Sequence, residues 1–346
     1  MADLALDNPQ KIKLLRLMDM LRAESDEQHP FTTSRIISRL GESNISLDRR
    51  TLAKDIALLN SFGYSVVTTT VGHENAYYVE RRSFSVPELK VLIDAVQATE
   101  FIPEQDTADI VDRIAELGGH HKAEVLKENL VCFNNYKHSN SEIFSSIDQL
   151  EKAINARKKT SFYYFDLNEH GERIFRRNYS RYTVDPMALV YDSNKYYLIC
   201  YSIDGVYRYR VDRMSEVSVE ADDLNPNASA VREKVGEYNR TAFMMFNGNL
   251  EEVTLEFDDK ILGAVQDKFG ERAPVERIRV GEATYDSSGL STRCRLTTKV
   301  QISDPFWGWL FQFSGRMKIT APPSAVQFYY EKLAAAAEEM KEMRKG

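Results

Sequence analysis

Residues 195–214 read KYYLICYSIDGVYRYRVDRM, and this stretch decides how the middle of the chain folds. The pair Asp204-Gly205 separates two runs rich in tyrosine and aliphatic residues, which is a strong signal for a tight β-hairpin. Side chains alternate between the two faces of a strand, so Arg208 and Arg210 share one face and the tyrosines between them share the other. Two arginines on one strand face repel each other unless an anion or an acidic group lies between them. The stretch therefore predicts a hairpin with a basic face.

The surrounding residues predict a small β-barrel over residues 159–224. Short turns, rather than helices, separate its β-rich stretches at 161–167, 179–191, 195–202 and 206–219. Guanidinium groups bind phosphate and aromatic rings stack on bases. One interpretation is therefore a basic groove with aromatic walls, completed by Arg176, Arg177, Arg181, Tyr164 and Tyr182. The other interpretation is that Asp185, Asp212 and Glu216 neutralise these arginines in surface ion pairs.

The last hundred residues alternate between strands and helices. Residues 225–250 are expected to form a linker, and a second domain is expected over 251–346. Strands are predicted at Val253–Phe257, Val275–Val280, Thr292–Gln301 and Met317–Thr320, and helices at Asp259–Phe269, Asp304–Phe313 and Ser324–Met343. This βαββαβ order with one added helix is typical of a ferredoxin-like domain.

Residues 1–82 predict three helices followed by a β-hairpin, which is the order of a winged helix-turn-helix. The third helix begins near Ser46 or Asp48 and buries Leu52, Ile56 and Leu59. At roughly 100° per residue, Arg50 and Lys54 fall on the opposite side, where a helix enters the major groove. Asp55 turns toward the core as a partner for a basic residue. The candidate DNA-binding residues are Thr33, Ser34, Arg49, Arg50, Thr51, Lys54, His73 and Asn75.

The same pattern also fits an ordinary solvated helix with salt-linked charges, or an interaction module that never meets DNA. Residues 83–158 predict a helical connector, with a first helix that starts at Ser85 and has Glu88 three residues later. Further helices are expected at Thr107–Leu117 and Asn140–Lys158, and His120-His121 is expected in an exposed loop that ends a helix.

Composition limits the class of protein. The 346 residues carry a net charge of −7, which argues against a general nucleic-acid coat protein but permits one basic patch. Three distant cysteines indicate reduced thiols, and the N-terminus lacks the pattern of a signal peptide, so a cytoplasmic protein without a membrane partner is expected. The sequence has no HExxH, paired CxxC, Walker A, GxSxG or GxGxxG motif. We therefore expect no enzyme, no metal and no cofactor.

Taken together, these patterns resemble the bacterial WYL-domain transcriptional regulators over nearly the whole chain. The matching residues are RTLAKDI at 50–56, PMALVY at 186–191, YYL at 196–198 and YRYRVDRM at 207–214. Tyr196 replaces the tryptophan that opens the family's name-giving triplet, and it keeps an aromatic ring there. Lys54 replaces the usual arginine, which preserves the charge but loses bidentate geometry.

The resemblance implies an α+β multidomain protein with a winged helix-turn-helix, a helical connector, an Sm/SH3-like WYL barrel and a ferredoxin-like C-terminal extension. It implies a homodimer that binds double-stranded DNA, a repressor whose barrel senses a nucleotide or a single-stranded nucleic acid. The ligand contacts that it implies are Arg208, Arg210, Arg213, Tyr197 and Tyr182, with Arg293, Arg295 or Arg316 from the extension. The alternative is a non-transcriptional accessory protein that binds single-stranded nucleic acid through the barrel.

Overall fold

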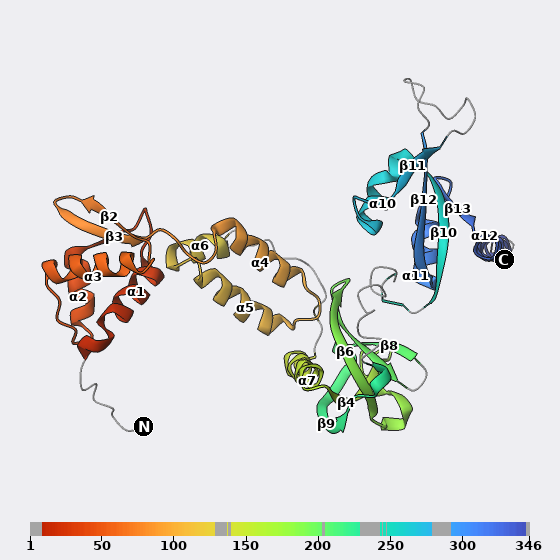
Figure 1. Cartoon of the computed structure of the whole chain (residues 1–346), viewed down its shortest axis with the longest axis horizontal. Coiled ribbons are helices and arrows are strands. Elements are labelled where there is room, and N and C mark those ends of the chain that lie inside the picture. The colour runs from red at the N-terminus through yellow and green to blue at the C-terminus, as the bar shows by residue number, and fades with distance from the viewer. Residues whose placement is uncertain are drawn as a thin grey trace. The chain divides into compact units, whose positions relative to one another are not determined.

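The computed structural model divides into two compact units, Met1–Ser141 and Glu142–Gly346 (Figure 1). It describes residues 9–128, 137, 140–202, 205–228, 243, 245–246, 248–278 and 292–343. Both units mix helices with antiparallel sheets, and in the second unit the sheets are curled. Among the described helices, none combines the length and the apolar character that crossing a bilayer requires.

The first unit begins with a small helical core beside a three-stranded sheet. A 3-10 turn η1 (Pro9–Ile12) leads into α1 (Lys13–Glu24), α2 (Thr33–Gly41) and α3 (Arg49–Ser61). The sheet has the order β1-β3-β2, formed by Phe31–Thr32, Glu74–Val79 and Val66–Val71. α3 starts at Arg49 because the Asp48 side chain accepts the Thr51 N–H, which caps the helix. The fully buried side chains of this core include those of Leu17, Leu21, Phe31, Ile36 and Leu52.

Three further helices of this unit have their own apolar core. They are α4 (Val86–Ala98), α5 (Glu104–Glu116) and α6 (His120–Glu128), which pack around Leu89, Ile93, Val111 and Ala115. The capping box at Ser85 and Glu88 is confirmed. The expectation for His120-His121 is wrong, because both residues lie in α6. Gly119, at φ +83, ends the preceding turn, and its carbonyl accepts the N–H of Ala123 to begin the new helix.

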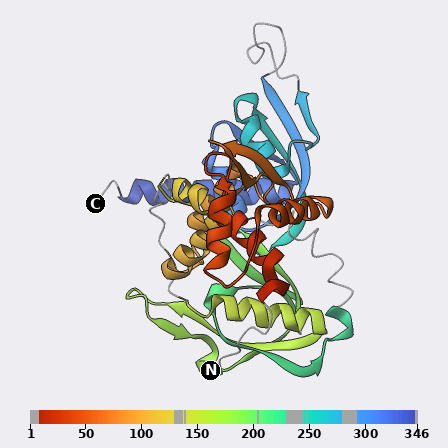
Figure 2. The same cartoon turned by 90° about the vertical axis from the view of Figure 1, so that its left-hand side faces the viewer.

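The second unit opens with helix α7 (Ile143–Ala156), which packs on β4, β6 and β9 of a curled sheet. Figure 2 shows this yellow-green helix lying along the sheet. The sheet order is β5-β4-β6-β7-β8, and β9 also pairs with β4. The strands are β4 (Lys158–Leu167), β5 (Arg173–Phe175), β6 (Tyr182–Asp192), β7 (Lys195–Ser202), β8 (Gly205–Arg210) and β9 (Met214–Asp223). The helix that the sequence placed at the end of the 83–158 connector therefore packs with this sheet.

The stretch 206–219, expected as one strand, is two strands separated by the 3-10 turn η3 (Val211–Arg213). Val211 and Asp212 are buried in this turn, which redirects the chain so that β9 pairs with β4. A second 3-10 turn, η2 (Arg176–Tyr179), precedes β6. Asp204 of the predicted hairpin lies outside the described residues, while β7 and β8 pair antiparallel as that hairpin requires.

The C-terminal elements form a four-stranded antiparallel sheet in the order β11-β12-β10-β13. The apolar core around Val253, Leu255, Trp307 and Leu310 lies between the sheet and its helices. Most of the predicted linker 225–250, and Arg279 and Val280 of the predicted second strand, lie outside the described residues. The elements are β10 (Asn249–Asp258), η4 (Asp259–Ile261), α10 (Leu262–Phe269), β11 (Val275–Ile278), β12 (Arg293–Ile302), α11 (Asp304–Gln312), β13 (Met317–Ala321) and α12 (Pro323–Met343).

Two cysteines, Cys200 and Cys294, are free thiols inside these sheets, and burial raises the pKa of both. Their thiols therefore stay protonated and unreactive at neutral pH. Cys132 lies outside the described residues.

Candidate functional site

A shared carboxylate organises the basic side chains of the curled sheet. Asp166 lies near the end of β4, and its Oδ2 accepts a 2.6 Å hydrogen bond from Arg176 Nε, while its Oδ1 lies 3.0 Å from Arg176 Nη2. Arg213 Nη1, from η3, donates to the same Oδ1 at 3.1 Å. The hydrogen bond from Arg176 holds the pKa of Asp166 below its usual value, so the carboxylate stays charged.

A second carboxylate holds Arg210. Arg210 Nε lies 3.1 Å from Asp212 Oδ1, and Nη2 lies 2.6 Å from Oδ2, in a bidentate pair. The side chain of Asp212 is only 2% exposed. Burial alone would lower the pKa of Arg210, but the hydrogen bond and the negative charge of Asp212, with the nearby tyrosines, together outweigh it and the pKa is raised. The Arg210 backbone N–H donates to the Tyr164 hydroxyl at 3.2 Å.

Aromatic rings form the floor beneath these cations. Tyr182 is buried and stacks on Phe162 with a centroid distance of 5.6 Å. The guanidinium carbon of Arg177 lies 4.0 Å from the centroid of the Tyr182 ring, and that of Arg176 lies 5.2 Å from the Tyr164 ring. Burial raises the pKa of the neighbouring Tyr209 to about 12, so it stays neutral.

We call Arg176, Arg177, Arg210 and Arg213 the arginine cluster. Asp166 and Asp212 are the carboxylates that pair with it, so the four guanidinium groups carry two positive charges in excess. Guanidinium groups that are held by carboxylates beside aromatic rings have fixed positions, which suits bidentate binding of a phosphate. The arrangement can therefore accept an anion, with the guanidinium groups held above buried aromatic rings.

The structure brings together only some of the residues expected to bind ligand. Arg210 and Arg213 belong to the cluster, and Tyr197 pairs with Arg210 across β7 and β8. Arg208 shares the strand face of Arg210, and its Nη2 lies 3.4 Å from Gln301 Oε1 of β12. Tyr182 is 6% exposed with Arg177 over its ring, so it supports the cluster from below instead of offering an open face.

The interpretation that acidic residues neutralise the arginines is therefore correct for Arg210. Of the three carboxylates proposed, Asp212 performs this role and Glu216 pairs with Arg181, whereas Asp185 accepts the backbone N–H of Asn225 at 2.7 Å. Sequence reasoning missed Asp166. The signal was present, because Tyr164 and Asp166 are two residues apart on β4 and therefore lie on the same strand face.

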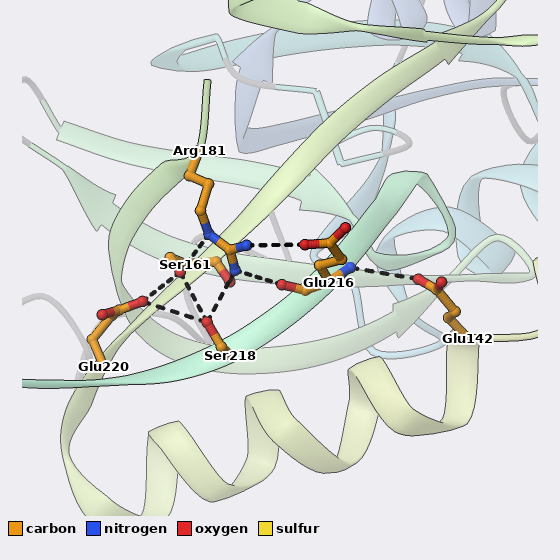
Figure 3. A network of polar contacts seen from close by, with 6 residues as sticks. All are labelled: Glu142, Ser161, Arg181, Glu216, Ser218 and Glu220. Carbon is orange, nitrogen blue, oxygen red and sulfur yellow. Dashed lines mark hydrogen bonds and ion pairs between the residues drawn. The ribbon is translucent and has the colours of Figure 1, made fainter. Parts of the chain in front are cut away.

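Arg181 is not part of the arginine cluster. It links β4 to β9 along the line where these two strands pair, which we call the β4–β9 seam (Figure 3). Its Nε donates to Ser161 Oγ at 3.0 Å, and its Nη2 donates to the Glu216 carbonyl at 2.6 Å and to Ser218 Oγ at 3.0 Å. Glu220 Oε1 accepts from Ser161 Oγ at 2.5 Å. The bonds span a bulge in the β4–β9 register, where Glu216 has a φ of +50. The role of Arg181 is structural.

Replacing Arg181 by alanine is expected to lower the free energy of unfolding by about 1–2 kcal/mol, because several seam acceptors lose a donor at once. Urea unfolding followed by circular dichroism measures the change. Arg181→Lys keeps the charge but cannot reach all these acceptors from one ammonium group, so it should recover only part of the loss. An unfolding midpoint unchanged in Arg181→Ala would contradict the structural role.

The face of α3 in the first unit has the expected polarity. Leu52, Ile56 and Leu59 are buried, whereas Arg50 and Lys54 are exposed, which confirms the predicted division of the helix. Asp55 is also confirmed as an internal partner, since Lys13 Nζ lies 2.7 Å from its Oδ2. The exposed side of α3 is therefore positively charged.

The other candidate DNA-binding residues of the first unit differ in their exposure and in their hydrogen-bond partners. Thr33 is buried and its hydroxyl donates to the Asn75 carbonyl at 2.9 Å, so it holds the hairpin and does not face outward as expected. The Thr51 hydroxyl is bonded to Asp48 at 3.0 Å, which makes it part of the helix cap. His73 and Asn75 are exposed. Ser34 and Arg49 both contact the carboxylate of Glu74.

Comparison with known proteins identifies the class of the curled sheet and its helix. Residues 145–219, from α7 into β9, match the family model described as WYL domain, so the chain contains a WYL domain. Among solved structures, the chain is similar to Proteasome accessory factor B/C (PafBC) of Arthrobacter aurescens, with 17% sequence identity and a TM-score of 0.27. The similarity covers 98% of this chain and 52% of that chain, so this chain spans about half its length. No curated protein matches the sequence.

Proposed function

We propose that this chain is a DNA-binding transcriptional regulator whose first 82 residues form a winged helix-turn-helix. The observation that carries the proposal is α3, whose apolar side is buried while Arg50 and Lys54 are exposed beside the β2–β3 hairpin. Residues 1–82 hold eleven basic and eleven acidic side chains, so this part is neutral although the whole chain carries −7. A neutral segment with a positive helix face approaches DNA more easily than the acidic remainder does.

We further propose that the WYL domain is an Sm-like barrel that senses a nucleotide or a short single-stranded nucleic acid. The arginine cluster supports this proposal, because guanidinium groups beside aromatic rings are suited to phosphates and bases. The antiparallel order β11-β12-β10-β13 supports a ferredoxin-like extension. In this proposal the protein is a homodimeric repressor, and ligand binding shifts the population of two arrangements that differ in DNA affinity.

The test is to select duplexes from a random library with the full-length protein and to measure their affinity by fluorescence anisotropy. A selected duplex should bind about a thousandfold more tightly than a scrambled one at the same salt concentration. Adding a short oligonucleotide or a nucleotide should then change the duplex affinity. If no sequence is enriched and all duplexes bind equally weakly, the chain is not a sequence-specific regulator.

A second candidate function is a non-transcriptional protein that binds single-stranded nucleic acid. The exposed guanidinium group of Arg177 favours it, because its outer face can stack on an unpaired base while Tyr182 supports it from beneath, without any help from the first unit. In that case, single-strand affinity should persist without any duplex preference, and substitutions in α3 should leave all binding unchanged.

A further inference from the structure

The carboxylate of Glu74, at the start of the β2–β3 hairpin's second strand, contacts two side chains of the proposed DNA-binding surface. The Ser34 hydroxyl donates to Glu74 Oε1, and Arg49 Nη2 lies 3.3 Å from the same oxygen. Ser34 lies on α2 and Arg49 lies on α3, so one carboxylate joins three elements. The Arg49 side chain is 74% exposed and that of Glu74 is 29% exposed, so solvent and ligands can reach the pair.

We propose that Glu74 is an internal competitor of the DNA phosphates, which keeps Ser34 and Arg49 engaged until a well-fitting duplex displaces it. This inference rests on the proposed function and adds a control of specificity to it. A hydroxyl and a guanidinium group are the donors that proteins commonly present to a phosphate. In the free protein a carboxylate of the same chain occupies both of them.

The negative charge of Glu74 weakens the binding of every duplex. Only a duplex that fits the protein surface well makes enough other contacts to offset this loss. The hydrogen bond from Ser34, followed by the charge of Arg49, keeps the pKa of Glu74 below its usual value, so its negative charge persists at neutral pH. A phosphate that takes Arg49 must approach this charge and break the ion pair. Nonspecific binding depends almost entirely on such charge contacts, so it should suffer more than specific binding.

The decisive variant is Glu74→Gln, which keeps the shape and an acceptor for Ser34 but removes the charge. Affinity for a nonspecific duplex should rise about tenfold. The slope of log affinity against log salt should steepen by about 0.9, because Arg49 becomes free to neutralise one phosphate. A role limited to holding the fold would not change this salt slope.

The matched control is Glu80→Gln, which removes the same charge from the exposed end of the same hairpin. It should change nonspecific affinity less than twofold, with no change in salt slope. Equal effects of the two variants would reduce the role of Glu74 to net charge and overturn the inference. If wild type binds a selected duplex but Glu74→Gln leaves nonspecific binding unchanged, only the competitor role fails. If neither protein binds any duplex, the proposed function fails and this inference fails with it.

A double-mutant cycle tests the competition itself and does not depend on the absolute affinity of one variant. Arg49→Ala should weaken nonspecific binding less than twofold in wild type, where Glu74 already engages the arginine. In the Glu74→Gln background it should weaken binding about tenfold. Losses that are the same in both backgrounds would show that Glu74 and Arg49 act independently and would overturn the proposal.

Discussion

Affinity for a selected duplex should fall about a hundredfold when Arg50 and Lys54 are both replaced by alanine, since each base or phosphate contact contributes about 1–3 kcal/mol. Both side chains are exposed on the side of α3 opposite its buried leucines. Their removal leaves that core intact, so the melting temperature should change little. The salt slope should also fall, by about 0.9 for each of the two cations that contacts a phosphate.

Fluorescence anisotropy at several salt concentrations measures both quantities. The matched control replaces two cations of the same unit, Arg113 on α5 and Lys127 on α6, and should leave the affinity within twofold of wild type. Unchanged duplex affinity in the Arg50→Ala, Lys54→Ala variant, with its fold intact, would exclude α3 as the recognition helix. The alternative of a single-strand binder would then be favoured.

The second large effect concerns the arginine cluster. Replacing Arg177 and Arg213 by alanine should weaken binding of a short single-stranded oligonucleotide about thirtyfold, because a stacking partner and a phosphate donor are lost together. This pair is better suited to the test than Arg210. Loss of Arg210 would strip the bidentate partner from the buried carboxylate of Asp212 and destabilise the domain. Asp166, by contrast, keeps Arg176 when Arg213 is removed.

Isothermal titration calorimetry with the oligonucleotide measures the loss, and a duplex titration shows whether the proposed coupling to DNA disappears with it. Lys260→Ala with Arg272→Ala removes two exposed cations from the C-terminal domain and serves as the charge control. Oligonucleotide affinity that stays at the wild-type value in the Arg177→Ala, Arg213→Ala variant would place the ligand elsewhere on the chain.

The sequence predicted elements well where periodicity and local signals agreed. Short-range spacing was enough to predict three features: the Ser85 capping box, the polarity of α3, and the alternation of strands and helices after Asn249. The interruption of the strand at η3 could not be predicted from the sequence. Val211 continues the apolar alternation of the preceding strand, and only the burial of Asp212 against Arg210 shows why the chain turns there.

The candidate site was predicted less completely than the fold, because ion pairing depends on tertiary neighbours. Arg181 and Arg213 look equivalent in sequence, yet Arg181 bonds to the β4–β9 seam and Arg213 bonds to Asp166. Thr33 was expected to face DNA, but its hydroxyl reaches a carbonyl 42 residues away. Sequence spacing within one strand or helix cannot reveal partners that lie on another element.

The guanidinium group of Arg82 joins the two cores of the first unit. It donates to the carbonyls of Arg22 at 2.8 Å and Ser25 at 2.7 Å, both from the end of α1. Its Nη2 also packs against Gly119, where an added Cβ would lie 2.5 Å away. Position 119 therefore requires glycine for two reasons: a side chain would collide with Arg82, and the backbone φ is positive. A side chain at 119 would displace the Arg82 guanidinium group and strain its two hydrogen bonds to the end of α1, so the start of α6 and the end of α1 depend on the same small space.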